Sequence, residues 1–209
     1  MTRLIAIAAA LAVVAGLGLT FALTMMGGEE DQFAQCRTSS VAGGAAQIGG
    51  EFTLVSETGE IVTDKEVIDQ PSLIYFGYTF CPDVCPLDNT RNAEAVDLLE
   101  ERGQMVKPVF ISVDPNRDTP EVMAEYTDYV HPRLLGLTGS EEQVRAASKA
   151  YRTFFQAHQP TEGEEDFYLV DHSTMTYLTL PEHGFVEFFR RDATAEQIAD
   201  RVQCFLDAR

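Results

Sequence analysis

The hydrophobic positions along the chain follow a strand-like pattern in several separate segments. Residues 51–63 alternate between apolar and polar positions around a turn and predict a small hairpin. Residues 72–79 (SLIYFGYT) form a continuous apolar and aromatic run, which is typical of a central strand covered on both faces. Residues 107–115 (KPVFISVDP) predict a second buried strand, and residues 134–139 (LLGLTG) predict a short third one.

Helical spacing of apolar residues separates these strands. It is clear over residues 92–103, where Gly103 suits the end of a helix that starts near Val84. Further helices are predicted before Pro132, up to about Phe154, and near the C-terminus. Their starts carry capping residues: Thr119 with Pro120, Ser140 with Gln143, and Thr194 with Gln197.

The last part of the chain changes from this alternation to a terminal hairpin. Residues 163–170 and 174–180 predict strands on either side of Asp171 and His172, and residues 185–191 predict the strand that follows. Strands alternating with helices, then a hairpin and a last helix, indicate an α/β fold. We predict a thioredoxin-like three-layer sandwich over residues 48–209, with the small hairpin at its N-terminal end.

The N-terminal segment has a different character. Residues 4–26 carry no charge, and this run is long enough to cross a hydrocarbon core of roughly 30 Å. A cleaved signal peptide is the alternative, but its apolar part would be shorter. Because Arg3 precedes the run and acidic residues follow it, we predict a single-pass anchor in a bacterial cytoplasmic membrane. Residues 1–3 would then be cytoplasmic, residues 27–47 a flexible tether, and the folded domain periplasmic.

The chain carries 33 acidic and 15 basic residues, for a formal net charge of −18. Such a surface repels nucleic acid and anionic lipid headgroups, and it favours basic partners or cations. We therefore expect no nucleic-acid partner. The periplasm is oxidising, so cysteines that stay reduced there need a chemical reason.

Two of the four cysteines lie close together directly after the predicted strand of residues 72–79. Cys81 and Cys85 fall at the start of a predicted helix, where unpaired backbone N–H groups and the helix dipole favour thiolate over thiol. Three interpretations remain open at this point. The pair is structural, it is a thiol–disulfide redox pair, or it is part of a soft-metal site. Redox pairs usually have two intervening residues, whereas this pair has three.

His172 is a candidate third ligand for a metal. In a thioredoxin-like sheet, the segment that carries it lies beside the turn that carries the cysteines. Two thiolates and one imidazole suit Cu(I) and also hold Cu(II), whereas zinc usually takes a fourth ligand. Asp171 either orients His172 or modulates the metal without binding it, or it pairs only with backbone amides of the loop.

Cys36 and Cys204 raise a separate question. On the last helix, Cys204 points about 150° away from the apolar face, and Cys36 lies in the predicted tether. Two exposed cysteines in an oxidising compartment predict a disulfide between the tether and this helix. Pairing between two chains is the alternative.

Three segments carry a specific resemblance to a known family. YFGYTFCPDVCP, ISVDPNRDTP and FYLVDHSTMTYL occur in this order, and together they resemble the Sco/SenC family of membrane-tethered, thioredoxin-fold copper chaperones for cytochrome c oxidase assembly. The resemblance spans about Gly49 to Ala208. It implies that Cys81, Cys85 and His172 bind copper and deliver it to the Cu-A centre of oxidase subunit II.

The resemblance also implies a possible reductase role, in which the same cysteines reduce the cysteine pair of the Cu-A centre. The leading interpretation remains a metallochaperone rather than a turnover enzyme, with a periplasmic thiol–disulfide oxidoreductase as the alternative. Another copper chaperone and a thioredoxin-like reductant are further expected partners. One departure is visible, because many members have histidine where this chain has Phe80.

Overall fold

The computed structural model describes residues 13–21, 31–39, 47–159 and 167–209. The chain divides into two compact units, Met1–Gln35 and Cys36–Arg209, which are described separately. In the first unit, residues 13–21 are helical. Among the described residues, no helix is long and apolar enough to cross a membrane. The remaining positions of the anchor predicted over 4–26 lie outside the described residues.

The second unit is built on a seven-stranded sheet with the order β2-β1-β5-β4-β3-β8-β9. Its central strands β3, β4 and β5 run parallel, and all its other pairings are antiparallel. The strands are β1 Thr53–Ser56, β2 Ile61–Thr63, β3 Ser72–Gly77, β4 Lys107–Ser112, β5 Leu135–Thr138, β8 Thr176–Leu180 and β9 Gly184–Phe189. β1 and β2 are the predicted hairpin. Strand β3 is buried at every position, as its continuous apolar run predicts.

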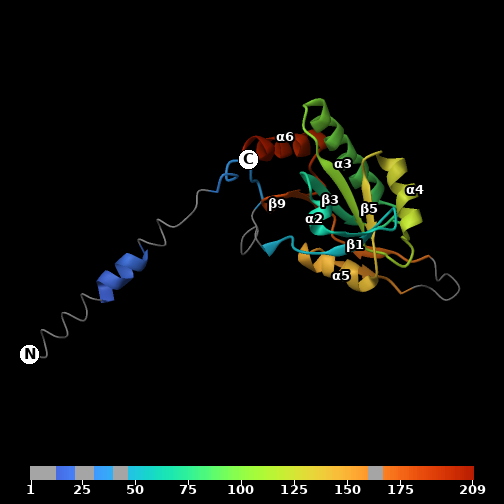
Figure 1. Cartoon of the computed structure of the whole chain (residues 1–209), viewed down its shortest axis with the longest axis horizontal. Coiled ribbons are helices and arrows are strands. Elements are labelled where there is room, and N and C mark those ends of the chain that lie inside the picture. Colours follow the sequence, from blue (N-terminus) through green and yellow to red (C-terminus); the bar gives the residue numbers. More distant parts are fainter. Residues whose placement is uncertain (1–12, 22–30, 40–46, 160–166) are drawn as a thin grey trace, which may run out of the picture. The chain divides into compact units, whose positions relative to one another are not determined.

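Helices cover this sheet on both sides (Figure 1). α3 and α6 pack against each other on one side, and α5 lies on the other. The rings of Phe52 and Phe76 pack on Tyr151, just after α5, with centroids 6.4 and 5.5 Å away. The helices are α2 Asp64–Val67, α3 Val84–Glu101, α4 Pro120–Val130, α5 Glu141–Ala150 and α6 Ala195–Asp207. These layers form the predicted thioredoxin-like α/β arrangement.

The predicted capping residues lie at the observed helix starts. Ser140 and Gln143 bond reciprocally at the start of α5, and the same capping box begins α6. α5 ends at Ala150, earlier than the prediction of about Phe154. Arg152 has a φ of 50°, a left-handed conformation that cannot continue the helix, and the Ser148 hydroxyl bonds the backbone just beyond it.

The chain before β8 differs from the predicted strand pattern. β7 covers only Val170–His172 and pairs antiparallel with β6 (Phe155–Ala157), in a two-stranded sheet separate from the main one. Asp171 and His172 therefore lie within a strand rather than between two strands. The pattern gave no sign of β6, which supplies the pairing. Residues 163–166 of the predicted strand lie outside the described residues.

Residues 36–39 of the predicted tether belong to the second unit. Cys36 and Cys204 form a disulfide, with their Cα atoms 5.7 Å apart. The carboxylate of Glu187 on β9 is fully buried, and it accepts a hydrogen bond of 2.9 Å from the Thr38 backbone N–H. Thr38 and Ser39 are therefore held against β9, while α6 supplies the other half of the disulfide.

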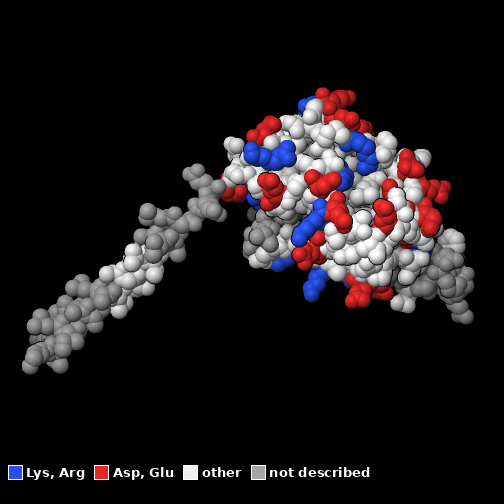
Figure 2. All heavy atoms as spheres, viewed as in Figure 1, with Lys and Arg blue, Asp and Glu red and all other residues white. Residues whose placement is uncertain are grey.

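Charged side chains cover much of the visible face of the molecule. Figure 2 shows acidic groups spread over the folded unit, with basic groups between them. The excess of acidic residues along the chain accounts for the net charge of −18. Such a surface favours encounter with basic or cationic partners.

Candidate metal centre

The junction between β3 and α3 positions both cysteines of the CPDVC turn. Cys81 lies in the connecting turn, and Cys85 lies in the first turn of α3, which begins at Val84. The backbone N–H of Cys85 points at the Cys81 sulfur across 3.4 Å. A free N–H group of the helix start therefore faces this sulfur, and it stabilises negative charge there together with the helix dipole.

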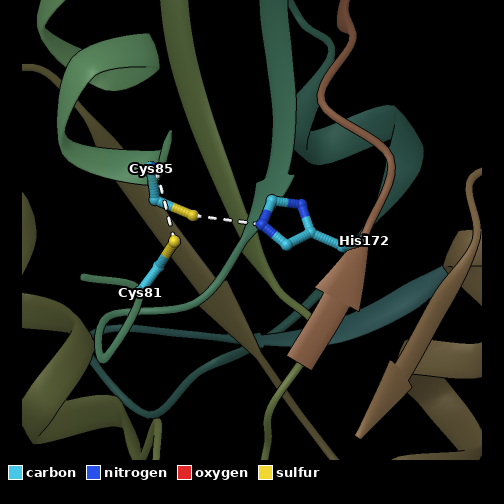
Figure 3. Close-up of side chains that lie close together, drawn as sticks. All are labelled: Cys81, Cys85 and His172. Atoms are coloured by element: carbon cyan, nitrogen blue, oxygen red, sulfur yellow. Dashed lines mark hydrogen bonds between the residues drawn. The ribbon is translucent and has the colours of Figure 1, made fainter. Parts of the chain in front are cut away.

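His172 comes to the same place from β7 (Figure 3). Its Nε2 atom lies 3.3 Å from the Cys85 Sγ atom. Its Nδ1 atom lies 2.9 Å from the carbonyl oxygen of Ser173, so a proton on Nδ1 is hydrogen-bonded and Nε2 is left to face the sulfur. The imidazole edge packs against the rings of Tyr75 and Tyr78, with centroids 6.2 and 5.7 Å away.

The structure thus brings together the three residues that the sequence singled out as metal ligands. One ligand atom from each of Cys81, Cys85 and His172 lies within 4.8 Å of the other two. Both cysteines are buried and free of disulfides, while His172 is partly exposed. Two sulfurs and an imidazole nitrogen at this separation are a donor set for a soft, thiophilic metal ion.

The pKa values of the two thiols are shifted in opposite directions. The side-chain hydrogen bond from Cys85 lowers the pKa of Cys81 to about 4, against the effect of burial and with help from backbone N–H groups. The same hydrogen bond, together with burial, raises the pKa of Cys85. At neutral pH the pair therefore holds one proton, with Cys81 as a thiolate and Cys85 as its hydrogen-bond donor.

Three residues behind the ligands were missed by sequence reasoning. A Cβ atom on Gly77 would lie 2.7 Å from the Cys85 sulfur, so the absence of a side chain makes room for the ligand. The Tyr75 hydroxyl lies 4.0 Å from that sulfur and donates a hydrogen bond of 2.9 Å to Asp88. A glycine inside a buried strand is a sequence signal of such close approach. The contacts of Tyr75 with Cys85 and Asp88 could be found only from the three-dimensional structure.

Asp171 does not join the ligand group in the structure. Its carboxylate lies 2.9 Å from the Nε2 atom of His158, on the exposed side of the strand pair. Successive side chains of a strand point to opposite faces, so Asp171 faces away when His172 faces the cysteines. The contact that orients His172 comes instead from the Ser173 carbonyl.

Comparison with known proteins assigns the chain to a family. The SCO1/SenC family model matches residues 40–207, which is most of the chain. The chain is a member of the SCO1/SenC family. The resemblance carried by its three sequence segments is thereby confirmed. Protein SenC of Rhodobacter capsulatus is 56% identical over 203 residues, which make up 97% of this chain and 90% of SenC.

Solved structures of SCO1/SenC proteins share the fold of this member. The crystal structure of Arabidopsis thaliana ScoI with copper bound matches with a TM-score of 0.72 and 39% identity, over 77% of this chain and 99% of that one. The structure of Bradyrhizobium japonicum ScoI with copper bound matches with a TM-score of 0.67 and 36% identity, over 75% of this chain and 98% of that one. The predicted thioredoxin-like α/β fold is confirmed.

Proposed function

We propose that this SCO1/SenC protein binds one copper ion through Cys81, Cys85 and His172. The observation that carries the proposal is the convergence of two sulfurs and an imidazole nitrogen within 4.8 Å. Softness of the thiolates favours copper over magnesium or calcium, and a three-ligand set suits Cu(I). The copper-bound structures of two relatives support the choice of metal. Because Cys85 holds the proton of the pair, copper binding releases that proton.

We further propose that the protein delivers this copper to the Cu-A site of cytochrome c oxidase subunit II. Transfer between proteins needs a surface on which the partner docks, and exposed apolar side chains adjoin each ligand-bearing segment. They are Phe80, Leu87, Phe154, Phe167 and Leu169, each at least half exposed. Phe80 precedes Cys81, Leu87 is on the first turn of α3, and the Phe154 carbonyl bonds the Ser173 N–H beside His172.

The proposed surroundings follow from this role. We propose that residues 4–26 anchor the chain in a bacterial cytoplasmic membrane and that the folded unit faces the periplasm, where the Cu-A domain of the oxidase lies. Another copper chaperone would load the site. Because the periplasm is oxidising, a thioredoxin-like reductant would keep Cys81 and Cys85 in the dithiol form that holds copper.

A thiol–disulfide reductase is the second candidate, and the asymmetric thiol pair supports it. The Cys81 thiolate would attack a partner disulfide, form a mixed disulfide and release one partner thiolate. Cys85 would then lose its proton and attack the Cys81 sulfur. This step closes the Cys81–Cys85 disulfide and releases the second partner thiol. Two electrons pass from the dithiol to the partner, and the same cysteines serve both candidate functions.

A transfer experiment separates the two functions. The full-length protein, reduced and loaded with Cu(I), is mixed with a soluble, copper-free Cu-A domain whose two cysteines are either reduced or oxidised. Copper appearing in the reduced domain, and lost with His172→Ala, supports the chaperone. Reduction of the oxidised domain without copper transfer, at a rate that ignores His172→Ala, supports the reductase and contradicts our proposal.

A further inference from the structure

His172 is attached to the metal centre less directly than the two cysteines are. Both cysteines follow β3, which lies between β4 and β8 in the main sheet, whereas His172 belongs to the separate sheet of β6 and β7. The hydrogen bonds of the main sheet therefore fix the strand that leads to the cysteines, whereas the strand that carries His172 is not part of that sheet. Side-chain contacts between the two ligand-bearing segments must set the distance from His172 to the sulfurs.

Arg117 lies between these two segments, although it belongs to neither of them. It is in the loop between β4 and α4, and its side chain is only 9% exposed. Its guanidinium carbon lies 3.7 Å from the ring centroid of Tyr168, 4.8 Å from that of Phe80 and 5.7 Å from that of Tyr78. Tyr78 and Phe80 precede the first cysteine ligand, and Tyr168 precedes the histidine ligand.

A buried carboxylate holds this arrangement in a fixed orientation. Asp114 is 3% exposed, and one of its oxygens accepts a hydrogen bond from the Arg117 Nε–H group. Its other oxygen accepts a hydrogen bond of 2.6 Å from the Tyr168 hydroxyl. The guanidinium and the tyrosine ring thus share one acceptor while they stack on each other. A desolvated contact of this kind is among the stronger cation–π interactions.

The cysteine side of the contact has an independent attachment to the sheet. Asp118 is fully buried and accepts hydrogen bonds from the backbone and hydroxyl of Thr79 and from the hydroxyl of Ser112 on β4. The turn that carries Cys81 is therefore fixed without Arg117. On the histidine side, the contacts to this turn include the Arg117–Tyr168 stack and a bond of 3.3 Å from the Val170 N–H to the Tyr78 hydroxyl, besides the packing of His172 itself on the Tyr78 ring.

We propose that Arg117 is a positioning residue of the metal centre, which fixes the β6–β7 strand pair so that His172 stays within reach of Cys81 and Cys85. The role in copper binding rests on the proposed function, but the positioning of the strand pair does not. Phe80 has a part in it, since the ring at this position stacks on the guanidinium.

The test compares wild-type protein with Arg117→Lys, which keeps the charge but loses the flat stacking surface and the Nε donor. Arg133→Lys is the matched control, because Arg133 is also partly buried and paired with a carboxylate, that of Glu100, on helix α3. Amide hydrogen exchange is measured first in the metal-free, reduced proteins at Val170, Asp171 and Ser173, whose N–H groups face the Tyr78 hydroxyl or strand β6. The Cu(II) electron paramagnetic resonance spectrum then reports whether an imidazole nitrogen is bound.

We expect Arg117→Lys to speed amide exchange at these three residues about tenfold or more, with β3 amides unchanged, and to weaken the nitrogen signal of bound Cu(II). Arg133→Lys should leave both readouts at wild-type values. Unchanged exchange in Arg117→Lys would overturn the positioning role, even if wild-type protein binds no copper. If wild type shows no copper signal but the variant exchanges faster, the proposed function fails while the positioning role stands.

A second variant covers the outcome in which Arg117→Lys unfolds the domain and β3 amides exchange freely. Tyr168→Leu removes the ring from the histidine side only, and Tyr168 is partly exposed. We expect the same local increase in exchange at Val170, Asp171 and Ser173, and a wild-type exchange pattern there would overturn the proposal.

Discussion

Gly77 offers the sharpest test of how the fold sets the metal centre. A Cβ atom added there would lie 2.7 Å from the Cys85 sulfur, 2.9 Å from a carbon of the Phe110 ring and 3.0 Å from a carbon of the Tyr75 ring. Ordinary contact begins at 3.4 Å, so in Gly77→Ala the sulfur would have to retreat by about 0.7 Å.

This displacement is large on the scale of metal coordination, where bond lengths are defined to about 0.2 Å. Changes immediately behind a ligand typically reduce metal affinity by roughly 10- to 100-fold, and we expect a Cu(I) affinity loss of that size for Gly77→Ala. Overpacking of a buried position also costs about 1–3 kcal/mol of stability. The assays are anaerobic Cu(I) competition with a chromophoric chelator and urea unfolding of the metal-free protein.

Gly136→Ala is the matched control. Its added Cβ atom would be crowded to a similar degree, 2.6 Å from a Glu57 carboxylate oxygen and 3.0 Å from a methyl carbon of Thr127, but on β5 and away from the ligands. It should lose comparable stability and keep its copper affinity within about twofold, since local packing changes at distant sites act independently. Wild-type affinity in Gly77→Ala, or an equal affinity loss in Gly136→Ala, would refute the reasoning.

Three further predictions concern the disulfide, the thiol pair and the buried acid of β9. The Cys36–Cys204 disulfide closes a loop of sequence separation 168, so replacing both residues by serine should cost up to about 5 kcal/mol in urea unfolding while leaving copper binding intact. Because the pKa of Cys81 is lowered to about 4, ultraviolet thiolate absorbance should stay constant from about pH 6 to 8; in Cys85→Ala the pKa should rise, so that absorbance increases with pH. Glu187→Ala leaves the Thr38 and Ser39 N–H groups without their acceptor, which should cost about 1–3 kcal/mol and speed their amide exchange. An unchanged unfolding free energy in the double serine variant would contradict the first prediction. Wild-type thiolate absorbance that titrates near pH 8.5 would contradict the second, and unchanged amide exchange in Glu187→Ala would contradict the third.

The sequence alone predicts the two candidate cysteine ligands because their signals are local. A buried strand, a turn with two cysteines and a helix start are contiguous in the chain, and the chemistry of a thiolate at a helix N-terminus follows from that order. His172 could be added because the alternation of strands and helices predicts a thioredoxin-like sheet, which places its segment beside the turn.

The contacts that orient these residues could not be predicted in the same way, because they join distant parts of the chain. Arg117 stacks on Tyr168 across 51 positions, and nothing near either residue marks the pair. Asp171 adjoins His172 in sequence, which suggests a shared role, yet strand geometry sends its carboxylate to His158. The burial of Glu187 could not be predicted for the same reason, since its hydrogen-bond partners lie about 149 residues away.

The most direct test of the central claim is copper binding by the reduced, anaerobic full-length protein beside a His172→Ala variant, first with Cu(I) and then with Cu(II). We predict one tightly held copper ion per wild-type chain, thiolate-to-copper charge-transfer absorption with Cu(II), and loss of retention in the variant. If neither protein binds copper specifically, while both reduce disulfides at the same rate, the CPDVC turn is a redox pair and the copper-binding account is wrong.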